Sequence, residues 1–370
     1  MRALCIVLDS VGCGHAPDAA DFGDKGANTL GHLRERIPNL AWPHLASLGL
    51  DDLLNPPFPS KLQEKNAARL TELSAGKDTT TGHWELMGAQ LTEPFATFER
   101  FPEDLVAELE QIGGRSFLGN EAASGTEILA RLGAEHFRTG QPILYTSADS
   151  VLQIAAHEDP HIFGLERLQQ WCRDARAVLD RRNCRIGRVI ARPFVGDPTN
   201  GFQRTSHRHD YSLQPPETVL NRLTAAGVPV HGIGKIHDIF AGSGITHSHP
   251  TPSNAAGMAT IERLWSERVD GLVFANLVDF DTLYGHRRDP DGYARCLIEF
   301  DTWLGTFLPK IEANDLLIIT ADHGNDPYHA GTDHTREQVP LLTRHAAPIR
   351  ENPTFSEVAR LLEVAFLPPS

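Results

Sequence analysis

Three apolar runs of strand length in this sequence end in acidic residues: Asp9 after "CIVL", Asp279 and Asp281 after "FANLV", and Asp322 after "LIIT". In open α/β sheets, ligands bind beyond the carboxyl ends of the parallel strands, so we expect these carboxylates to converge. A single aspartate at a strand end is also a common turn former or helix cap. A group of convergent like charges destabilises itself unless cations neutralise it, and this favours a metal site.

Histidines follow these carboxylates at short intervals. His286 comes five residues after Asp281, His323 is next to Asp322, and His334 comes twelve residues after Asp322. Three oxygen donors and three nitrogen donors are thus candidate ligands: Asp9, Asp281, His286, Asp322, His323 and His334. This number is sufficient for two ions. Mixed carboxylate and imidazole ligands favour Mn²⁺ or Zn²⁺ over Ca²⁺, and two ions about 3.5–4 Å apart are the usual arrangement for phosphoryl chemistry.

A site of this kind also needs a nucleophile, and the segment "GKDTTTGHWELMG" (76–88) contains three adjacent threonines. The residues "TGHWELM" are typical of the first turns of a helix. A hydroxyl at a helix N-terminus lies among free backbone N–H groups at the positive end of the helix dipole, which suits a residue that carries phosphate. Spacing does not choose among Thr79, Thr80 and Thr81, and a threonine here could equally be an N-cap without any chemistry.

The elements that must position these residues alternate regularly. Residues 3–8 form an apolar run typical of a parallel strand covered on both faces. From about 217 onward, helical segments alternate with strand-like runs, including a helix with Ser253 as its N-cap and a strand over 271–281. This pattern predicts an α/β fold with a doubly wound, mostly parallel sheet.

The regular alternation of helices and strands is absent between about 96 and 216. Amphipathic helices, one of them with Pro102 near its start, are mixed there with short strand-like pieces. Because the strand at 3–8 and those after 217 fit one sheet, we predict that 96–216 is an inserted α+β domain and that 1–95 and 217–370 form the core domain. The Pro-rich stretch at 55–60 is expected to be a surface loop.

Bulk composition excludes several classes of protein. The 370 residues carry a formal net charge of −14 with 41% hydrophobic and 22% charged residues, so a general nucleic-acid binder is not expected. No apolar segment approaches the roughly 20 residues that span a bilayer. Asp9 interrupts the N-terminal apolar run, so we expect no signal peptide and a cytoplasmic location. The five cysteines form no C-x-x-C pair, which argues against a disulfide framework or a cysteine-ligated zinc.

Taken together, the motifs resemble those of the phosphopentomutases of the alkaline phosphatase superfamily, the bacterial type that uses two manganese ions. The matching stretches are "LDSVGCGHAPDA", "GKDTTTGHWELMG", "YTSADSVLQIAAHE", "VIARPFVGDP", "RHDYSL", "NLVDFDTLYGHRRDP" and "TADHGNDPYHAGTDHTREQVPLL". They extend over nearly the whole chain, whereas "ADHG" alone would indicate only the superfamily.

The resemblance implies an alkaline phosphatase-like core with a cap, and specific roles for individual residues. Asp9, Asp322 and His323 would hold one Mn²⁺, and Asp281, His286 and His334 the other. Thr79 would carry phosphate between substrates. The residues that would bind the phosphosugar are Asp149, Arg188, Arg204 and Lys235.

The implied reaction interconverts the 1-phosphates and 5-phosphates of ribose and deoxyribose through a 1,5-bisphosphate. A ribose 1,5- or glucose 1,6-bisphosphate type of activator would first phosphorylate the threonine. The expected partner is a small phosphosugar, with no nucleic acid and no membrane, and a monomer is compatible with the sequence.

Three other functions use the same features. A metal-dependent phosphatase or phosphodiesterase would share the six ligands and differ in the inserted domain. A phosphoglycerate-type mutase would have a serine nucleophile, where this sequence has threonine. A binding module without catalysis would not need every ligand to be present.

Overall fold

The computed structural model describes residues 1–54, 67–147 and 150–368. The chain divides into two compact units, one formed by Met1–Glu93 with Pro215–Ser370 and the other by Pro94–Gln214. The predicted loop at 55–60 lies outside the described residues. Among the described helices, none has the length and apolar character needed to cross a bilayer.

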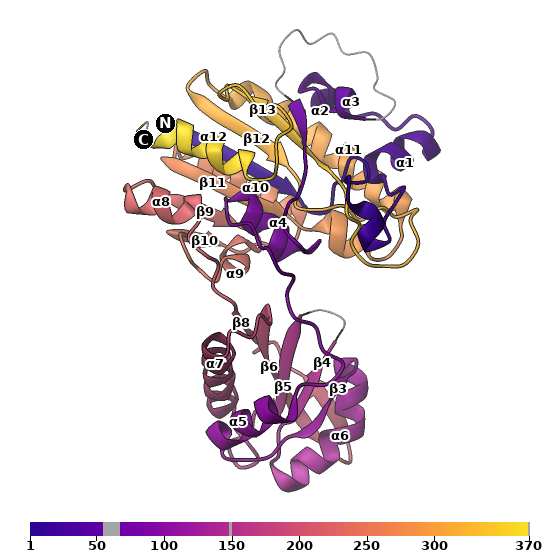
Figure 1. The fold of residues 1–370 in the computed structure, drawn as a ribbon, viewed down its shortest axis with the longest axis vertical. Coiled ribbons are helices and arrows are strands. Elements are labelled where there is room, and N and C mark those ends of the chain that lie inside the picture. The colour runs from indigo at the N-terminus through magenta and orange to yellow at the C-terminus, as the bar shows by residue number, and fades with distance from the viewer. Residues whose placement is uncertain (55–66, 148–149, 369–370) are drawn as a thin grey trace. The chain divides into compact units, whose positions relative to one another are not determined.

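The first unit is built on a mixed sheet whose described strands follow the order β10-β9-β11-β1-β12-β13-β2 (Figure 1). Its strands are β10 (His247–His249), β9 (Val230–Ile233), β11 (Gly271–Leu277), β1 (Arg2–Leu8), β12 (Asp315–Thr320), β13 (Val339–Arg344) and β2 (Ala67–Leu70). The five strands from β10 to β12 in this order are parallel to one another, and β13 is antiparallel to both β12 and β2. The predicted α/β fold with a mostly parallel sheet is confirmed.

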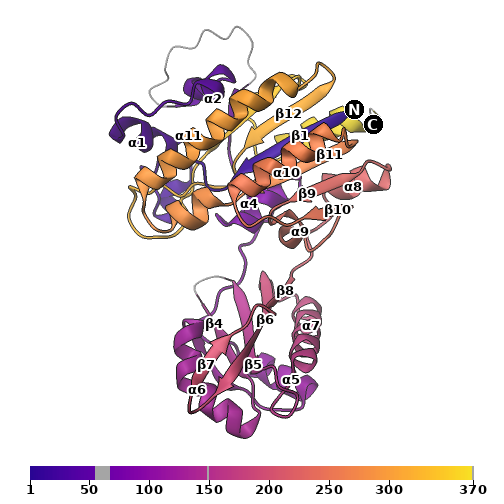
Figure 2. The same cartoon turned by 180° about the vertical axis from the view of Figure 1, so that it is seen from behind.

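Helices cover both faces of this sheet, which explains why its central strands are apolar throughout. Every residue of β1, β11 and β12 is buried. Figure 2 shows α10 and α11 across one face, and Figure 1 shows α4 and α12 on the other. The helices of this unit are α1 (Thr29–Arg36), α2 (Pro43–Ser47), α3 (Leu50–Leu53), α4 (Thr79–Leu86), α8 (Val219–Ala225), α9 (Ile236–Ile239), α10 (Asn254–Ser266), α11 (Pro290–Phe307) and α12 (Glu357–Phe366).

The local signals at element ends are partly as predicted. Ser253 caps α10, and its side chain accepts a hydrogen bond from the backbone N–H of Ala256. The strand predicted over 271–281 is too long, because β11 ends at Leu277 and the chain winds into a π-helical turn over Phe280–Gly285.

Strand register aligns the acidic strand ends. Leu8 of β1 is paired with Leu277 of β11, and Val7 is paired with Thr320 of β12. The three strands therefore end at one level, and the segments that contain Asp9, Asp281 and Asp322 leave the same edge of the sheet.

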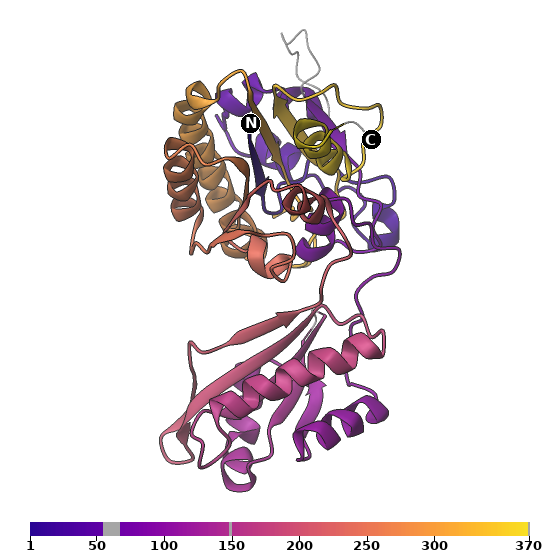
Figure 3. The same ribbon diagram turned by 90° about the vertical axis from the view of Figure 1, so that its left-hand side faces the viewer.

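The second unit has a sheet of its own (Figure 3). Its strand order is β3-β4-β5-β6-β7, and β8 is also paired with β6. Its strands are β3 (Leu118–Ala122), β4 (Ile143–Thr146), β5 (Val151–His157), β6 (Arg188–Asp197), β7 (Gly201–Arg204) and β8 (His209–Ser212). The β3–β4 and β5–β6 pairs are parallel, and the other neighbouring pairs are antiparallel. Its helices are α5 (Glu103–Gly113), α6 (Gly125–Thr139) and α7 (Leu165–Arg181).

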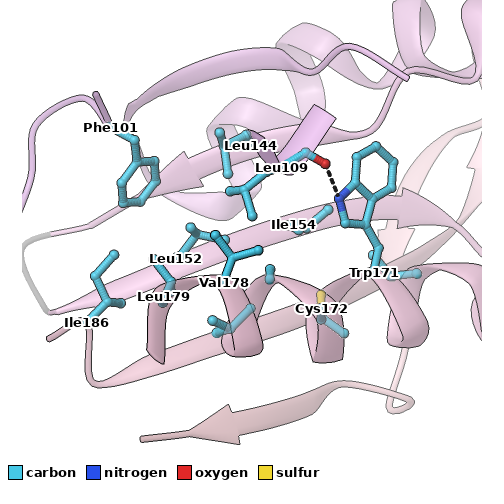
Figure 4. Close-up of a cluster of buried hydrophobic side chains, with 14 of the residues drawn as sticks. Phe101, Leu109, Leu144, Leu152, Ile154, Trp171, Cys172, Val178, Leu179 and Ile186 are labelled. Atoms are coloured by element: carbon cyan, nitrogen blue, oxygen red, sulfur yellow. Dashed lines mark hydrogen bonds between the residues drawn. The ribbon is translucent and has the colours of Figure 1, made fainter. Parts of the chain in front are cut away.

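An apolar core of its own stabilises this second unit. Side chains from α5, α7 and the sheet pack together around Leu109, Leu152 and Val178 (Figure 4). The buried Trp171 contributes both apolar surface and a hydrogen bond, because its indole Nε1–H donates to the carbonyl of Leu109 at 3.0 Å.

Candidate metal centre and nucleophile

One set of candidate ligands gathers around Asp281. This residue lies in the π-helical turn, and His286 follows directly after the turn. The Nε2 atom of His286 lies 3.1 Å from Asp281 Oδ2, and the Nε2 atom of His334 lies 3.5 Å from Asp281 Oδ1. The two Nε2 atoms lie 3.2 Å apart. The three side chains thus present their donor atoms to one point and could hold a metal ion.

A second set lies where β1 and β12 end. The Nε2 atom of His323 is 3.5 Å from Asp9 Oδ1 and 3.4 Å from Asp322 Oδ2. Donor atoms of Asp9, Asp281 and His323 all lie within 4.8 Å of one another and form a second group that could hold a metal. Asp281 belongs to both groups. The structure therefore brings together all six residues that the sequence singles out.

Hydrogen bonds fix the orientation of the three imidazoles. Each ring lies with Nδ1 next to a backbone carbonyl: His286 next to Thr332 O at 2.7 Å, His323 next to Gly324 O at 3.0 Å and His334 next to Lys77 O at 3.1 Å. A carbonyl can only accept, so Nδ1 carries a proton in each ring, and a ring without a second proton has its lone pair on Nε2. This tautomer is the one that metal-binding histidines adopt when an outer partner holds the second ring nitrogen.

The carboxylates are held in a similar way. The side-chain amide of Asn276 donates to Asp9 Oδ2 at 3.0 Å, and that of Asn325 donates to Asp281 Oδ1 at 2.8 Å. The backbone N–H of Ser10 donates to Asp322 Oδ1 at 3.1 Å. Two buried oxygens of these carboxylates accept no hydrogen bond within the described residues, namely Asp9 Oδ1 and Asp322 Oδ2. Buried carboxylate oxygens need a partner, and a cation would supply it, so the residues present fit divalent ions.

Electrostatics in the cluster also favour cations. Burial and the charge of Asp322 raise the pKa of Asp9. Burial acts against charge on His323, yet the carboxylates of Asp322 and Asp9 raise the pKa of this imidazole well above its usual value. Burial likewise acts against charge on Asp281, but hydrogen bonds from His286 and His334 keep its pKa below the usual range. Carboxylates at this density attract positive charge.

The nucleophile segment reaches this cluster through the start of α4. Asp78 caps the helix, and its Oδ1 accepts hydrogen bonds from the backbone N–H groups of Thr80 and Thr81 at 3.0 and 3.1 Å. The hydroxyl of Thr81 donates to Asp78 Oδ2. The hydroxyl of Thr79 instead lies 3.1 Å from His323 Nε2. Between Thr79 and Thr81, Thr79 is the one whose hydroxyl contacts a candidate ligand.

Comparison with known proteins shows where the chain belongs. A family model described as the metalloenzyme superfamily matches residues 1–365. A phosphopentomutase from Symbiobacterium thermophilum is 52% identical over 355 residues, which cover 94% of this chain and 89% of the relative. Another phosphopentomutase, from Syntrophotalea carbinolica, is 52% identical over 345 residues, which cover 92% of this chain and 87% of the relative.

This chain belongs to the phosphopentomutase family. The family predicted from the motifs is confirmed, and membership in the metalloenzyme superfamily implies that the chain binds divalent metal. A solved structure of Leishmania mexicana phosphoglycerate mutase has a TM-score of 0.50 at 11% identity and covers 100% of this chain and 96% of its own. This last similarity concerns the fold alone.

The residues that the sequence predicts for substrate binding lie in separate parts of the chain. Lys235 is exposed and caps α9 directly after β9, at the same edge of the sheet as the metal cluster. Arg188 begins β6, with Nη1 3.6 Å from Asp210 Oδ2, and Arg204 is exposed at the end of β7. Asp149 lies outside the described residues.

Sequence reasoning missed an arginine that links the nucleophile segment to a ligand loop. Arg336 lies two residues after His334 and is buried. Its guanidinium donates to Glu72 Oε2 at 2.6 Å and to the carbonyl of Gly76 at 2.5 Å, and it also contacts Asp18. The position of Gly76, three residues before Thr79, is thus tied to the His334 loop.

A second missed arginine, Arg288, connects the π-helical turn to the loop after β12. It donates to Asn325 Oδ1 at 2.5 Å and to the carbonyl of Asp326 at 2.9 Å. Asn325 in turn orients Asp281. Charged residues so close to predicted ligands are the only sequence signal for these two roles, and their partners become visible only in the folded chain.

Proposed function

We propose that this chain is a phosphopentomutase that interconverts the 1-phosphates and 5-phosphates of ribose and 2-deoxyribose. The observation that carries the proposal is the gathering of six candidate metal ligands beside the hydroxyl of Thr79. The family membership is consistent with it, and so is the exposed cation of Lys235 at the same edge of the sheet. We place the protein in the cytoplasm, where free phosphosugars occur.

Two Mn²⁺ ions are the proposed cofactors. Asp9, Asp322 and His323 would hold one ion. Asp281, His286 and His334 would hold the other. The mixture of oxygen and nitrogen donors supports Mn²⁺ as the choice of metal. When bound, such ions lower the pKa of a nearby hydroxyl and neutralise the charge of a phosphoryl group.

Thr79 would act as the phosphate carrier. In the first transfer the bond between Thr79 Oγ1 and phosphorus breaks, and a new phosphorus–oxygen bond forms to the free hydroxyl of the sugar monophosphate. The proton of that hydroxyl ends on Thr79 Oγ1. The product is a 1,5-bisphosphate and a free Thr79. In the second transfer the other phosphoryl group of the bisphosphate moves to Thr79. A bisphosphate activator would load the threonine initially.

The second unit, Pro94–Gln214, would serve as a cap that binds the distal phosphate and excludes water. Arg188 and Arg204 are the proposed phosphate ligands, because a guanidinium donates to two phosphate oxygens at once. Asp149 would bind a sugar hydroxyl. Burial lowers the pKa of the Arg192 guanidinium, and the nearby Arg208 and Arg204 act in the same direction, so Arg204 belongs to a local group of arginines. Water that reached phosphorylated Thr79 would hydrolyse it, so exclusion of water separates a mutase from a phosphatase.

A coupled assay tests the proposal. Ribose 1-phosphate is supplied with Mn²⁺ and a trace of bisphosphate, and ribose 5-phosphate and inorganic phosphate are both measured. We expect ribose 5-phosphate to form with Mn²⁺ and not with a chelator. Release of inorganic phosphate without isomerisation would identify a phosphatase instead.

A further inference from the structure

The helix that carries Thr79 is packed directly against a metal-ligand residue. A Cβ atom on Gly82 would lie 2.0 Å from the carbonyl oxygen of Asp322. No side chain fits into that distance, so the backbone of α4 touches the backbone at residue 322. Residue 83, the next one along the helix, is therefore held beside the Asp322 carboxylate.

His83 occupies this position and is completely buried. Its Nδ1 atom lies 2.8 Å from the carbonyl of Thr79, and the same nitrogen lies 3.1 Å from Asp322 Oδ2. The Nδ1–H group is aligned with the Thr79 carbonyl, which can only accept, so Nδ1 is the donor in this contact. The Nδ1 atom of His83 thus contacts both Thr79, the proposed nucleophile, and Asp322, a proposed metal ligand.

The other side of the ring makes no polar contact within the described residues. Nε2 of His83 is buried without a hydrogen-bond partner, and the ring lies next to Phe274 at a centroid distance of 6.1 Å. Burying an unpaired ring nitrogen costs free energy that a leucine or phenylalanine would not incur. The contacts of Nδ1 are what an imidazole adds here over an apolar side chain.

We infer that His83 is a positioning residue that sets Asp322 relative to Thr79. Its N–H group holds the first carbonyl of α4, and its ring stands against Asp322 Oδ2, an oxygen that accepts no hydrogen bond within the described residues. The inference rests on the proposed function, in which Asp322 is a ligand and Thr79 carries phosphate. Without Nδ1, the contact that joins the start of α4 to the Asp322 carboxylate is lost.

Two amide substitutions separate this role from simple packing. In His83→Asn the amide nitrogen takes nearly the place of Nδ1, whereas in His83→Gln it lies near the place of Nε2. Both are uncharged and polar, so they share the cost of burying an amide in an apolar site. His83→Leu removes every polar atom. Each variant is measured as the full-length protein for Mn²⁺ affinity by calorimetry without substrate, for kcat and KM in the mutase assay, and for melting temperature.

We expect His83→Asn to keep kcat and Mn²⁺ affinity within about threefold of the wild type. We expect His83→Gln and His83→Leu to lose about 10–100-fold in Mn²⁺ affinity or kcat, with KM for the sugar phosphate nearly unchanged, as is typical when an outer partner of a metal ligand is removed. Equal losses in Asn and Gln, or wild-type kcat and affinity in Gln, would overturn the inference. If His83→Leu does not fold, the Asn–Gln comparison still decides. A failure of the proposed function would show in the wild type itself, which would then bind no Mn²⁺ or form no ribose 5-phosphate.

Discussion

The hydroxyl oxygen of Thr79 lies 3.1 Å from Nε2 of His323, the ring nitrogen that also faces Asp9 and Asp322. A hydroxyl at the first residue of a helix is thereby placed at the edge of a cluster built to hold cations. The relationship joins two segments 244 positions apart in the chain. This geometry is the reason to expect that Thr79 carries phosphate.

Thr79→Ala should abolish mutase turnover and leave Mn²⁺ binding largely intact, because the hydroxyl is removed while all six candidate ligands remain. The measurements are ribose 5-phosphate formation and metal content after dialysis. Thr79→Ser should retain part of the activity, since it keeps a hydroxyl. Thr80→Ala, one residue along the same helix, is the matched control and should stay active. Turnover by Thr79→Ala would assign the phosphate carrier elsewhere.

Asp281→Asn should reduce binding at the position that it shares with His286 and His334, and also at the neighbouring position, because an Asp281 oxygen lies within 4.8 Å of the donor atoms of Asp9 and His323 as well. His286→Ala should mainly reduce one of them. Metal content per chain after dialysis against Mn²⁺ therefore distinguishes the two variants, with the greater loss in Asp281→Asn. Asp270→Asn, at an exposed position, controls for the change in net charge. Full metal content in Asp281→Asn would contradict the shared position of this carboxylate.

Arg336→Met should destabilise the protein by about 3–5 kcal/mol, because it leaves the buried carboxylate of Glu72 without its charged partner. The side chains of Arg336 and Glu72 are only 2% and 1% exposed. Urea unfolding measures the change. Arg268→Met breaks the ion pair with Glu312, whose members are 70% and 56% exposed, and should cost less than about 1 kcal/mol. Glu72→Gln combined with Arg336→Met should recover part of the loss, since the unpaired charge is then absent.

Acid should destabilise the second unit through His136. This buried imidazole accepts a hydrogen bond from the backbone N–H of His157 at Nε2 and contacts the carbonyl of Gln141 through Nδ1. Burial lowers its pKa from 6.5 to about 4. The unfolded chain therefore takes up the proton first, so the contribution to stability is complete above pH 6.5 and is lost as the pH falls toward 4.

The test is denaturant unfolding of the full chain at several pH values between 7.5 and 4.5. His136→Leu should be less stable at neutral pH and should lose less stability on acidification than the wild type. His161→Leu, at an exposed histidine of the same unit, should keep the wild-type pH dependence. An unchanged pH dependence in His136→Leu would show that the proton is taken up by another group.

Much of the fold could be predicted because the signals were local. The apolar runs of β1, β11 and β12 are continuous because both faces of the sheet are covered, and Ser253 marks the start of α10 by its own hydrogen bond. Asp9, Asp281 and Asp322 could be predicted as site residues because they come shortly after these apolar runs in the sequence. Convergence of their side chains followed from the general rule that parallel strands present their carboxyl ends at one edge.

The remaining features depend on contacts between distant segments. Asn276 orients Asp9 across 267 positions of sequence, and Arg336 reaches Glu72 across 264. An asparagine inside a strand and an arginine in a loop carry no local pattern that names such partners. The early end of β11 was also missed, since "VDFD" continues an apolar alternation that fits a strand as well as a π-helical turn.

That π-helical turn limits how far the backbone can be made more regular in order to stabilise the protein. The backbone N–H of His286 bonds to the carbonyl of Asp281 five residues earlier, so one more residue is held in this turn than in an ordinary α-helix. The extra residue lets side chains five positions apart face the same point. Regular α-helical hydrogen bonding of the same residues would put Gly285, and not His286, on the face of Asp281, because neighbours on an α-helix are three or four positions apart. Regular backbone and functional geometry exclude each other at this bend, and improvement of one sacrifices the other.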